Sequence, residues 1–209
     1  MTIDNFDAIG EIMDFSDPNL FYFIQIIKRK KDNNPDTTKS SKLIKSYSVF
    51  NRAYLDNNKE EMIEIAKLFN ARIYISVNQK NKEKVFKQVL SDLSLKNLHG
   101  NFDFANAIDS AIGSNFEHST KKFLVDIDTK DPDIVSRVVN DVNNYVYPPT
   151  TEERIVKIVP TIQGFHIICK PCRLGDLVGR YEDGIVGYQS NSNTLLYYSD
   201  DKADKGVLG

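Results

Sequence analysis

Apolar and polar positions alternate most clearly in the short segment 122–128, Lys-Phe-Leu-Val-Asp-Ile-Asp. Successive side chains of a strand point to opposite faces of a sheet, so the Phe, Val and Ile at its odd positions share one face. Asp126 and Asp128 share the other face, and their carboxylates project side by side. Like charges about 7 Å apart repel unless a cation or a basic group lies between them. We therefore expect a cation between the two carboxylates at the end of this strand, and a divalent metal is the natural candidate.

A helix cap or a solvated strand end is the alternative explanation for an Asp-x-Asp sequence. Here Asp131-Pro132-Asp133 follows directly and supplies the N-cap and the first turn of the next helix. Because the capping role is already filled, Asp126, inside the strand, has no such role to explain it.

Hydrophobic periodicity also predicts the other elements of the chain. Strands are expected at 21–27, 46–55, 72–77, 122–128, 154–160 and 162–169, with more strand material within 185–198. Helices are expected at 6–15, 59–69, 80–93, 101–112 and 132–145, with a short helix at 174–178. This mixture predicts an α+β protein.

The order of these elements predicts two lobes. Residues 46–119 are expected to form a small α/β lobe, which an N-terminal segment, 1–45, precedes. Residues 120–209 follow a β-α-β-β-α-β order, which is typical of ferredoxin-like folds and of the RNA-recognition motif (RRM). We expect this RRM-like lobe to carry the metal and nucleotide site.

The second informative segment is 160–171, Pro-Thr-Ile-Gln-Gly-Phe-His-Ile-Ile-Cys-Lys-Pro. On a strand, Gly164 and His166 share a face, and the glycine leaves room beside the imidazole for something to approach closely. A single histidine on a strand is often an ordinary hydrogen-bonded residue. Its occurrence in one supersecondary unit with the Asp-x-Asp segment favours a site.

Two cysteines, Cys169 and Cys172, could form a redox pair or half of a zinc site. The chain has no second pair of cysteines to complete that zinc site. His166 is three residues from Cys169, and on a continuing strand this odd separation places the two side chains on opposite faces.

The composition is that of an ordinary soluble protein, with 41% hydrophobic and 27% charged residues in a chain of 209. No apolar run reaches about 18 residues and the start lacks a signal-peptide pattern, so we expect no membrane contact and a cytoplasmic location. A net charge of -2 argues against a strongly basic nucleic-acid binder, but it allows an enzyme that grips phosphates locally. The many Asn, Lys, Asp and Ile residues indicate an AT-rich genome such as that of a phage, which would place the protein in the host cytoplasm.

The sequence Arg-x-Tyr occurs twice, at Arg52/Tyr54 and at Arg72/Tyr74, each time within a predicted strand. An exposed arginine with an aromatic ring suits a nucleic-acid strand or a nucleotide, through phosphate contact and base stacking. The alternative is a tyrosine that lies under a covering helix while its arginine reaches for solvent.

Taken together, these segments resemble the archaeo-eukaryotic primase superfamily, in particular the compact primase-polymerases of phages and mobile elements. Leu-Val-Asp126-Ile-Asp128 is similar to the first motif of that family, hydrophobic-Asp-hydrophobic-Asp. Thr161-Ile-Gln-Gly164-Phe-His166 is similar to the second motif, which ends in histidine. The resemblance implies that Thr161 and Gly164 shape the nucleotide pocket and that His166 meets the triphosphate.

The third motif of the family is a hydrophobic-Asp sequence on the strand after the short helix. The segments 185–189 and 194–198 contain no acidic residue. Asp176 and Asp183 lie nearby, and Asp183, in a turn signal, is the better candidate for a third metal ligand.

The resemblance implies a DNA primase or primase-polymerase, a nucleotidyltransferase that acts on a single-stranded DNA template in phage or mobile-element DNA replication. Nucleoside triphosphates would be its substrates and Mg²⁺ or Mn²⁺ its cofactor. A helicase would be a separate protein, because the glycine-rich loop of ATPase motors is absent. The residues and roles so implied are metal binding by Asp126, Asp128 and Asp183, triphosphate contact by His166, Lys170 and Arg173, and nucleic-acid contact by Arg52, Arg72 and Tyr74.

Two other classes of function remain open. The chain could keep a primase-like fold and bind nucleic acid or a replication partner without catalysis. It could also be another metal-dependent phosphate enzyme, such as a nuclease. A haloacid-dehalogenase-like phosphatase is contradicted, because Lys130 occupies the last position of that Asp-x-Asp-x-Thr/Val motif.

Overall fold

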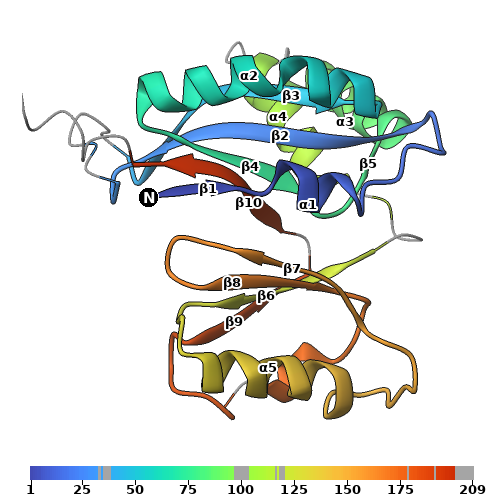
Figure 1. The fold of residues 1–209 in the computed structure, drawn as a ribbon. Coiled ribbons are helices and arrows are strands. Elements are labelled where there is room, and N and C mark those ends of the chain that lie inside the picture. The colour runs from blue at the N-terminus through green and yellow to red at the C-terminus, as the bar shows by residue number, and fades with distance from the viewer. Residues whose placement is uncertain are drawn as a thin grey trace, which may run out of the picture.

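Two stacked antiparallel sheets organise the protein (Figure 1). The computed structural model describes residues 1–32, 34, 39–96, 104–115, 117, 121–177, 179–190 and 192–200. Within these residues the expected α+β class is confirmed. No helix in these ranges is both long enough and apolar enough to cross a membrane.

The first sheet has the strand order β1-β10-β4-β2-β3, and a short strand, β5, pairs with β2. Its strands are β1 (Thr2–Asp4), β2 (Leu20–Arg29), β3 (Ser41–Val49), β4 (Arg72–Ser76), β5 (Lys80–Asn81) and β10 (Asn193–Ser199). Helix α2 (Arg52–Phe69) covers one face of this sheet, where Leu55 and Met62 pack with Ile24 and Ile26 of β2. Because side chains alternate along a strand, the odd-numbered positions of β2 face the opposite way.

The second sheet has the strand order β7-β8-β6-β9. Its strands are β6 (Phe123–Ile127), β7 (Ile155–Pro160), β8 (Phe165–Cys169) and β9 (Val186–Gln189). Helix α5 (Pro132–Asn144) covers its far face through Val138 and Val142, which pack against Val125 and Ile127. The side chain of Asp131 accepts hydrogen bonds from the next two free backbone amides of α5, so the expected cap is present.

The two sheets share one hydrophobic core on the side where α1 (Phe6–Gly10) lies. Leu124 and Ile168 of the second sheet belong to the same buried cluster as Tyr22 and Leu196 of the first. Since Val125 and Ile127 face α5, the side chains that alternate with them, Leu124 and Asp126, face the first sheet. The predicted alternation of this strand therefore points its carboxylate into the space between the sheets.

The order β6-α5-β7-β8-η2-β9 follows the expected β-α-β-β-α-β pattern, with one 3-10 turn, η2 (Leu174–Leu177), as its second helix. The first sheet, however, contains strands from all three of the expected segments, which were divided at residues 45 and 119. Strands β1 and β2 come from the segment 1–45 and β10 from the segment 120–209, yet all three lie in the first sheet. The segment 185–198 contains two strands that belong to different sheets.

The predicted strand at 46–55 is wrong beyond Val49. The side chain of Asn51 accepts a hydrogen bond from the Tyr54 amide at 2.8 Å and caps α2, which begins at Arg52. This cap satisfies a backbone amide that a helix start otherwise leaves unpaired, so the helix begins seven residues before the predicted Lys59. The expected helix at 6–15 is also shorter and ends at Gly10.

The predicted helices at 80–93 and 101–112 are both present, although residues 101–103 lie outside the described residues. Helix α3 spans Lys82–Lys96 and α4 spans Phe104–Ser114. The two pack against each other, and Ile108 and Ile112 of α4 contact Phe21 and Phe23 of β2. Helix α4 therefore covers part of the face of the first sheet that α2 leaves open.

A tight turn between β7 and β8 sets the position of His166. The Thr161 amide donates to the Gly164 carbonyl at 2.8 Å, and the Gly164 amide donates to the Thr161 hydroxyl at 3.0 Å. A Cβ on Gly164 would lie 1.9 Å from the Ile127 carbonyl oxygen. Only glycine allows the backbones to approach this closely.

Replacing Gly164 by alanine should lower the free energy of unfolding by at least about 3 kcal/mol, because backbone must move to admit the methyl group. Gly113→Ala is the matched control, since a Cβ at this helical position meets nothing within 4 Å. It should leave stability unchanged or raise it by up to about 1 kcal/mol. Urea unfolding of the two variants measures both effects, and equal stabilities would contradict the assigned role of Gly164.

Candidate functional site

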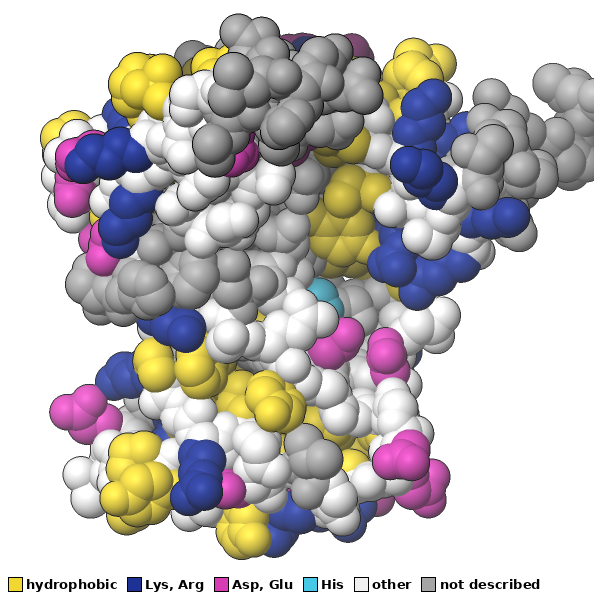
Figure 2. Space-filling view, turned by 180° about the vertical axis from the view of Figure 1, so that it is seen from behind, with side chains coloured by type: hydrophobic (Ala, Val, Ile, Leu, Met, Phe, Trp, Pro, Cys, Tyr) yellow, Lys and Arg dark blue, Asp and Glu magenta, His cyan; other side chains and the backbone are white. Residues whose placement is uncertain are grey.

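A cleft of about 630 Å³ opens between the two sheets. Figure 2 shows this hollow, with acidic side chains on the side of the second sheet and lysine and arginine side chains on the side of the first. Its volume lies within the range of roughly 300–1,000 Å³ that is usual for small-ligand sites. The cleft can therefore hold a ligand of nucleotide size.

The acidic wall centres on Asp126, which pairs with His166 across the β6–β8 ladder. His166 Nε2 lies 3.3 Å from Asp126 Oδ1, and His166 Nδ1 lies 2.9 Å from the Thr194 hydroxyl. The contact with Thr194 is a hydrogen bond, whereas the contact with Asp126 is a close electrostatic one. Because both ring nitrogens are engaged and the residue is buried, His166 is held in place and orients Asp126.

The second carboxylate, Asp128, lies just beyond the end of β6 and also lines the cleft. Its backbone amide donates to the Ile185 carbonyl at 2.9 Å, which fixes the chain at this point. Asp128 is exposed, whereas the Asp126 side chain is about one third exposed. Both carboxylates thus face the same open space with oxygen atoms accessible to a ligand.

Among the described residues, the two acidic residues that the sequence offered as a third ligand, Asp183 and Asp176, do not line the cleft. Asp183 lies in an exposed turn and does not line the cleft. Asp176 accepts a hydrogen bond from the Tyr147 amide at 3.2 Å and lies 3.6 Å from Arg173. The position that pairs with Asp126 on β9 is Gly187. Among the described residues, no group of three or more His, Cys, Asp or Glu residues has the geometry of a metal site.

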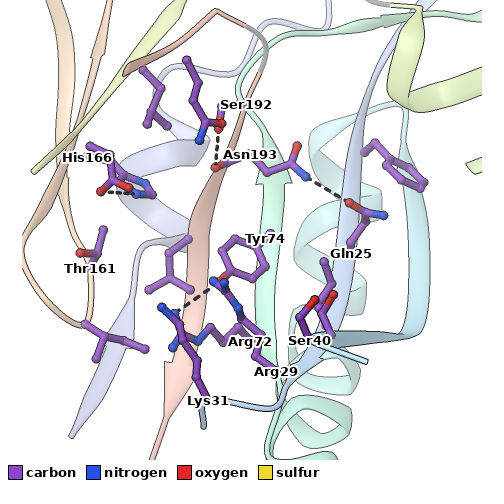
Figure 3. Close-up of a pocket in the computed structure, with 18 of the residues that line it drawn as sticks. Gln25, Arg29, Lys31, Ser40, Arg72, Tyr74, Thr161, His166, Ser192 and Asn193 are labelled. Atoms are coloured by element: carbon purple, nitrogen blue, oxygen red, sulfur yellow. Dashed lines mark hydrogen bonds and ion pairs between the residues drawn. The ribbon is translucent and has the colours of Figure 1, made fainter. Parts of the chain in front are cut away.

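The opposite wall is basic and comes from the first sheet (Figure 3). Arg29 and Arg72 both donate to the Tyr74 hydroxyl, at 3.1 Å and 3.4 Å. Arg72 also forms a two-point ion pair with Asp32, one contact of which is 2.7 Å. Within the described ranges no carboxylate pairs with Arg29 or Lys31, so these two side chains carry the uncompensated charge of this end of the cleft.

Several sequence-predicted residues lie outside the cleft. Lys170 forms an ion pair with Glu152 at 3.0 Å, and Arg173 lies beside Asp176. Arg52 is on α2 and pairs with Asp56 at 2.8 Å. Thr161 lines the cleft, whereas Gly164 does not. Gly164 is needed because the backbone of Ile127 and Thr129 approaches it too closely for a side chain.

The cysteines are both buried in the core between the second sheet and α5. His166 faces the cleft, so it lies on the other face of β8 from Cys169, as expected. A hydrogen bond with Cys169 and the nearby Arg154 guanidinium lower the pKa of Cys172 to about 7. The three side chains do not form a common metal site.

Sequence analysis missed Lys80, which lines the cleft and is only 4% exposed. Its Nζ donates to the Gly113 carbonyl at the end of α4, at 3.3 Å. No described carboxylate pairs with it, and burial lowers its pKa from 10.5 to about 8. Lys80 was predicted to begin a helix, whereas it lies on β5, paired with Phe21 of β2 and in contact with the end of α4.

Lys80→Met should raise the free energy of unfolding at pH 7 by about 1 to 3 kcal/mol, because one pKa unit corresponds to about 1.4 kcal/mol and the pKa of this lysine is lower in the folded state. The folded protein carries the full cost of the buried charge below pH 8. This cost fades between pH 8 and pH 10.5, where the folded state alone loses the proton. Urea unfolding at pH 7 and pH 10 should therefore show a smaller difference between variant and wild type at pH 10, and a destabilised variant at pH 7 would contradict this account.

Comparisons of this chain with protein-family models, curated proteins and solved structures give no match.

Proposed function

We propose that this chain catalyses metal-dependent nucleotidyl transfer, as a DNA primase or primase-polymerase on a single-stranded template. One observation carries the proposal: Asp126 and Asp128 face Arg29 and Lys31 across a cleft of nucleotide size. Carboxylates on one wall suit a divalent cation, and cations on the other suit phosphates. The same arrangement supports an RRM-like catalytic lobe as in archaeo-eukaryotic primases, in which β6 and β8 carry the first two motifs.

The donor set fits Mg²⁺ or Mn²⁺. Mg²⁺ is commonly held by one or two carboxylates together with substrate phosphates and water, which is what Asp126 and Asp128 can offer. When bound, such an ion lowers the pKa of an attacking hydroxyl and neutralises the leaving phosphates. The Asp126 side chain is about one third exposed, so the carboxylate stays accessible to an ion although His166 lies against its Oδ1.

The residues of the chain itself would position the reactants. Thr194 holds His166, and His166 lies against Asp126, which would favour one orientation of the carboxylate toward the ligand. Arg29 and Lys31 would contact phosphates of the template or primer. The Tyr74 hydroxyl, fixed by two guanidinium groups, leaves the ring in the cleft wall as a surface for a base.

A second candidate is a protein of the same fold that binds nucleic acid or a replication partner without catalysis. Gly187 favours it, because this residue occupies the place beside Asp126 where a third carboxylate would complete a metal site. The cleft and its basic wall would then serve binding alone.

Asp126→Asn should reduce incorporation of labelled nucleotides on single-stranded DNA, with Mg²⁺ or Mn²⁺, by about 100-fold or more, because the amide keeps the shape but loses the charge. Asp183→Asn, which removes the same charge from an exposed turn outside the cleft, should retain wild-type incorporation. Wild-type protein that binds the DNA but forms no product would instead support the non-catalytic candidate.

Gly187→Asp should tighten Mn²⁺ binding by about 10-fold, because it adds an oxygen ligand opposite Asp126 in the β6–β9 register. A Cβ at this position meets only the Asp126 Cβ, at 4.0 Å, so the side chain has room. Gly187→Asn is the uncharged control. Equal Mn²⁺ affinity of the Asp and Asn variants, measured by titration of the paramagnetic ion, would show that Asp126 and Asp128 do not bind the metal in this cleft.

A further inference from the structure

Lys80 is a buried cation at the margin of the cleft, and no carboxylate in the described part of the chain pairs with it. The residue is 4% exposed, and the one hydrogen bond that its Nζ makes to a described residue is to the Gly113 carbonyl. An ammonium group has three donors, so two remain for a ligand. Arg72, in contrast, has its charge matched inside the protein by Asp32.

The strand registers place Lys80 relative to the acidic wall. Lys80 pairs with Phe21 of β2, whereas Thr194, the partner of His166, lies level with Ile24 through Ile75 of β4. Three residues of strand span about 10 Å. Arg29 lies five residues beyond Ile24 in the other direction, or about 17 Å. Measured along β2, His166 and Asp126 therefore lie between Lys80 on one side and Arg29 on the other.

The chemistry of this place selects an anion. A buried ammonium whose charge is not balanced is costly to keep, and a ligand with negatively charged oxygen atoms would balance it. The neighbouring cleft walls add Gln25 and Asn193, whose amides hydrogen-bond to each other at 3.1 Å and bring no charge. Asp109 of α4 lines the cleft as well, and burial raises the pKa of its carboxyl group.

We propose that Lys80 is a receptor for a phosphate group of the ligand, so that the cleft grips phosphate at two places on either side of Asp126. This inference rests on the proposed function for the kind of ligand, but not on turnover. The phosphate could belong to the polyphosphate of a nucleotide or to the backbone of a nucleic-acid strand. Both sources present the same anionic oxygens to the ammonium group.

Binding to the full chain at pH 7 in EDTA tests this proposal without the metal site. The two probes are inorganic tripolyphosphate and a single-stranded oligothymidylate without a terminal phosphate. Lys80→Met is compared with Lys87→Met, which removes the same charge from an exposed position of α3. Lys80→Gln is measured beside them, and thermal melting establishes that each variant is folded.

Lys80→Met and Lys80→Gln should weaken one probe by about 10-fold or more, because a charge-assisted hydrogen bond is lost, whereas Lys87→Met should change neither by more than about 2-fold. Loss confined to tripolyphosphate assigns Lys80 to the nucleotide, and loss confined to the oligothymidylate assigns it to the strand. Unchanged affinity for both probes would overturn the proposal and leave Lys80 as a contact to the end of α4. Lys80-dependent binding by a wild-type protein without nucleotide incorporation would sustain the inference while the proposed catalysis fails.

Discussion

A line of close polar contacts from Asp126 through His166 to Thr194 ties the two sheets together at the place where chemistry would occur. Asp126 and His166 are neighbours across the β6–β8 ladder, but Thr194 belongs to β10 of the first sheet. The line therefore exists only when the sheets are stacked. His166 is buried and needs the hydrogen bond from its ring to Thr194, so the position of the imidazole beside the carboxylate depends on the whole fold.

Close approach of two backbones makes this line possible. Gly164 packs against the Ile127 carbonyl, so the turn after β7 delivers β8 in the register that sets His166 opposite Asp126. On the far face, Val125 and Ile127 anchor β6 to α5, while Leu124 anchors it to the shared core. Strand β6 is thus packed on both faces, which fixes the backbone position of Asp126.

Local signals in the sequence were sufficient for part of this arrangement. The alternation in 122–128 and the cap at Asp131 act over a few residues, and both are found where they were expected. The start of α2 was missed because Asn51, which caps the helix, was included in the predicted strand at 46–55. The sheet to which β10 belongs depends on pairing with β1 at the other end of the chain, which no local pattern encodes.

The candidate site shows the same division. The two carboxylates and the histidine share one supersecondary unit, so their proximity follows from strand periodicity. Arg29 and Lys31 come from a segment that the sequence marks only as a charged turn or loop that could also touch a phosphate backbone, and the stacking of the sheets brings them to the cleft. Lys80 became visible as a candidate only through its burial, because an isolated lysine in a sequence carries no sign of its environment.

The distribution of charge explains how a chain with a net charge of -2 could bind a polyanion. Overall charge contributes little to the field inside a cleft, where low-dielectric walls focus the nearest charges. The ion pair with Asp32 largely cancels the charge of Arg72, which leaves Arg29 and Lys31 at one end and Lys80 at the other. Salt screens exposed charges more strongly than buried ones, so Lys80 would keep its attraction for phosphate at ionic strengths that weaken the contribution of Lys31. A buried cation that costs folding stability can in this way provide the more persistent of the two phosphate contacts.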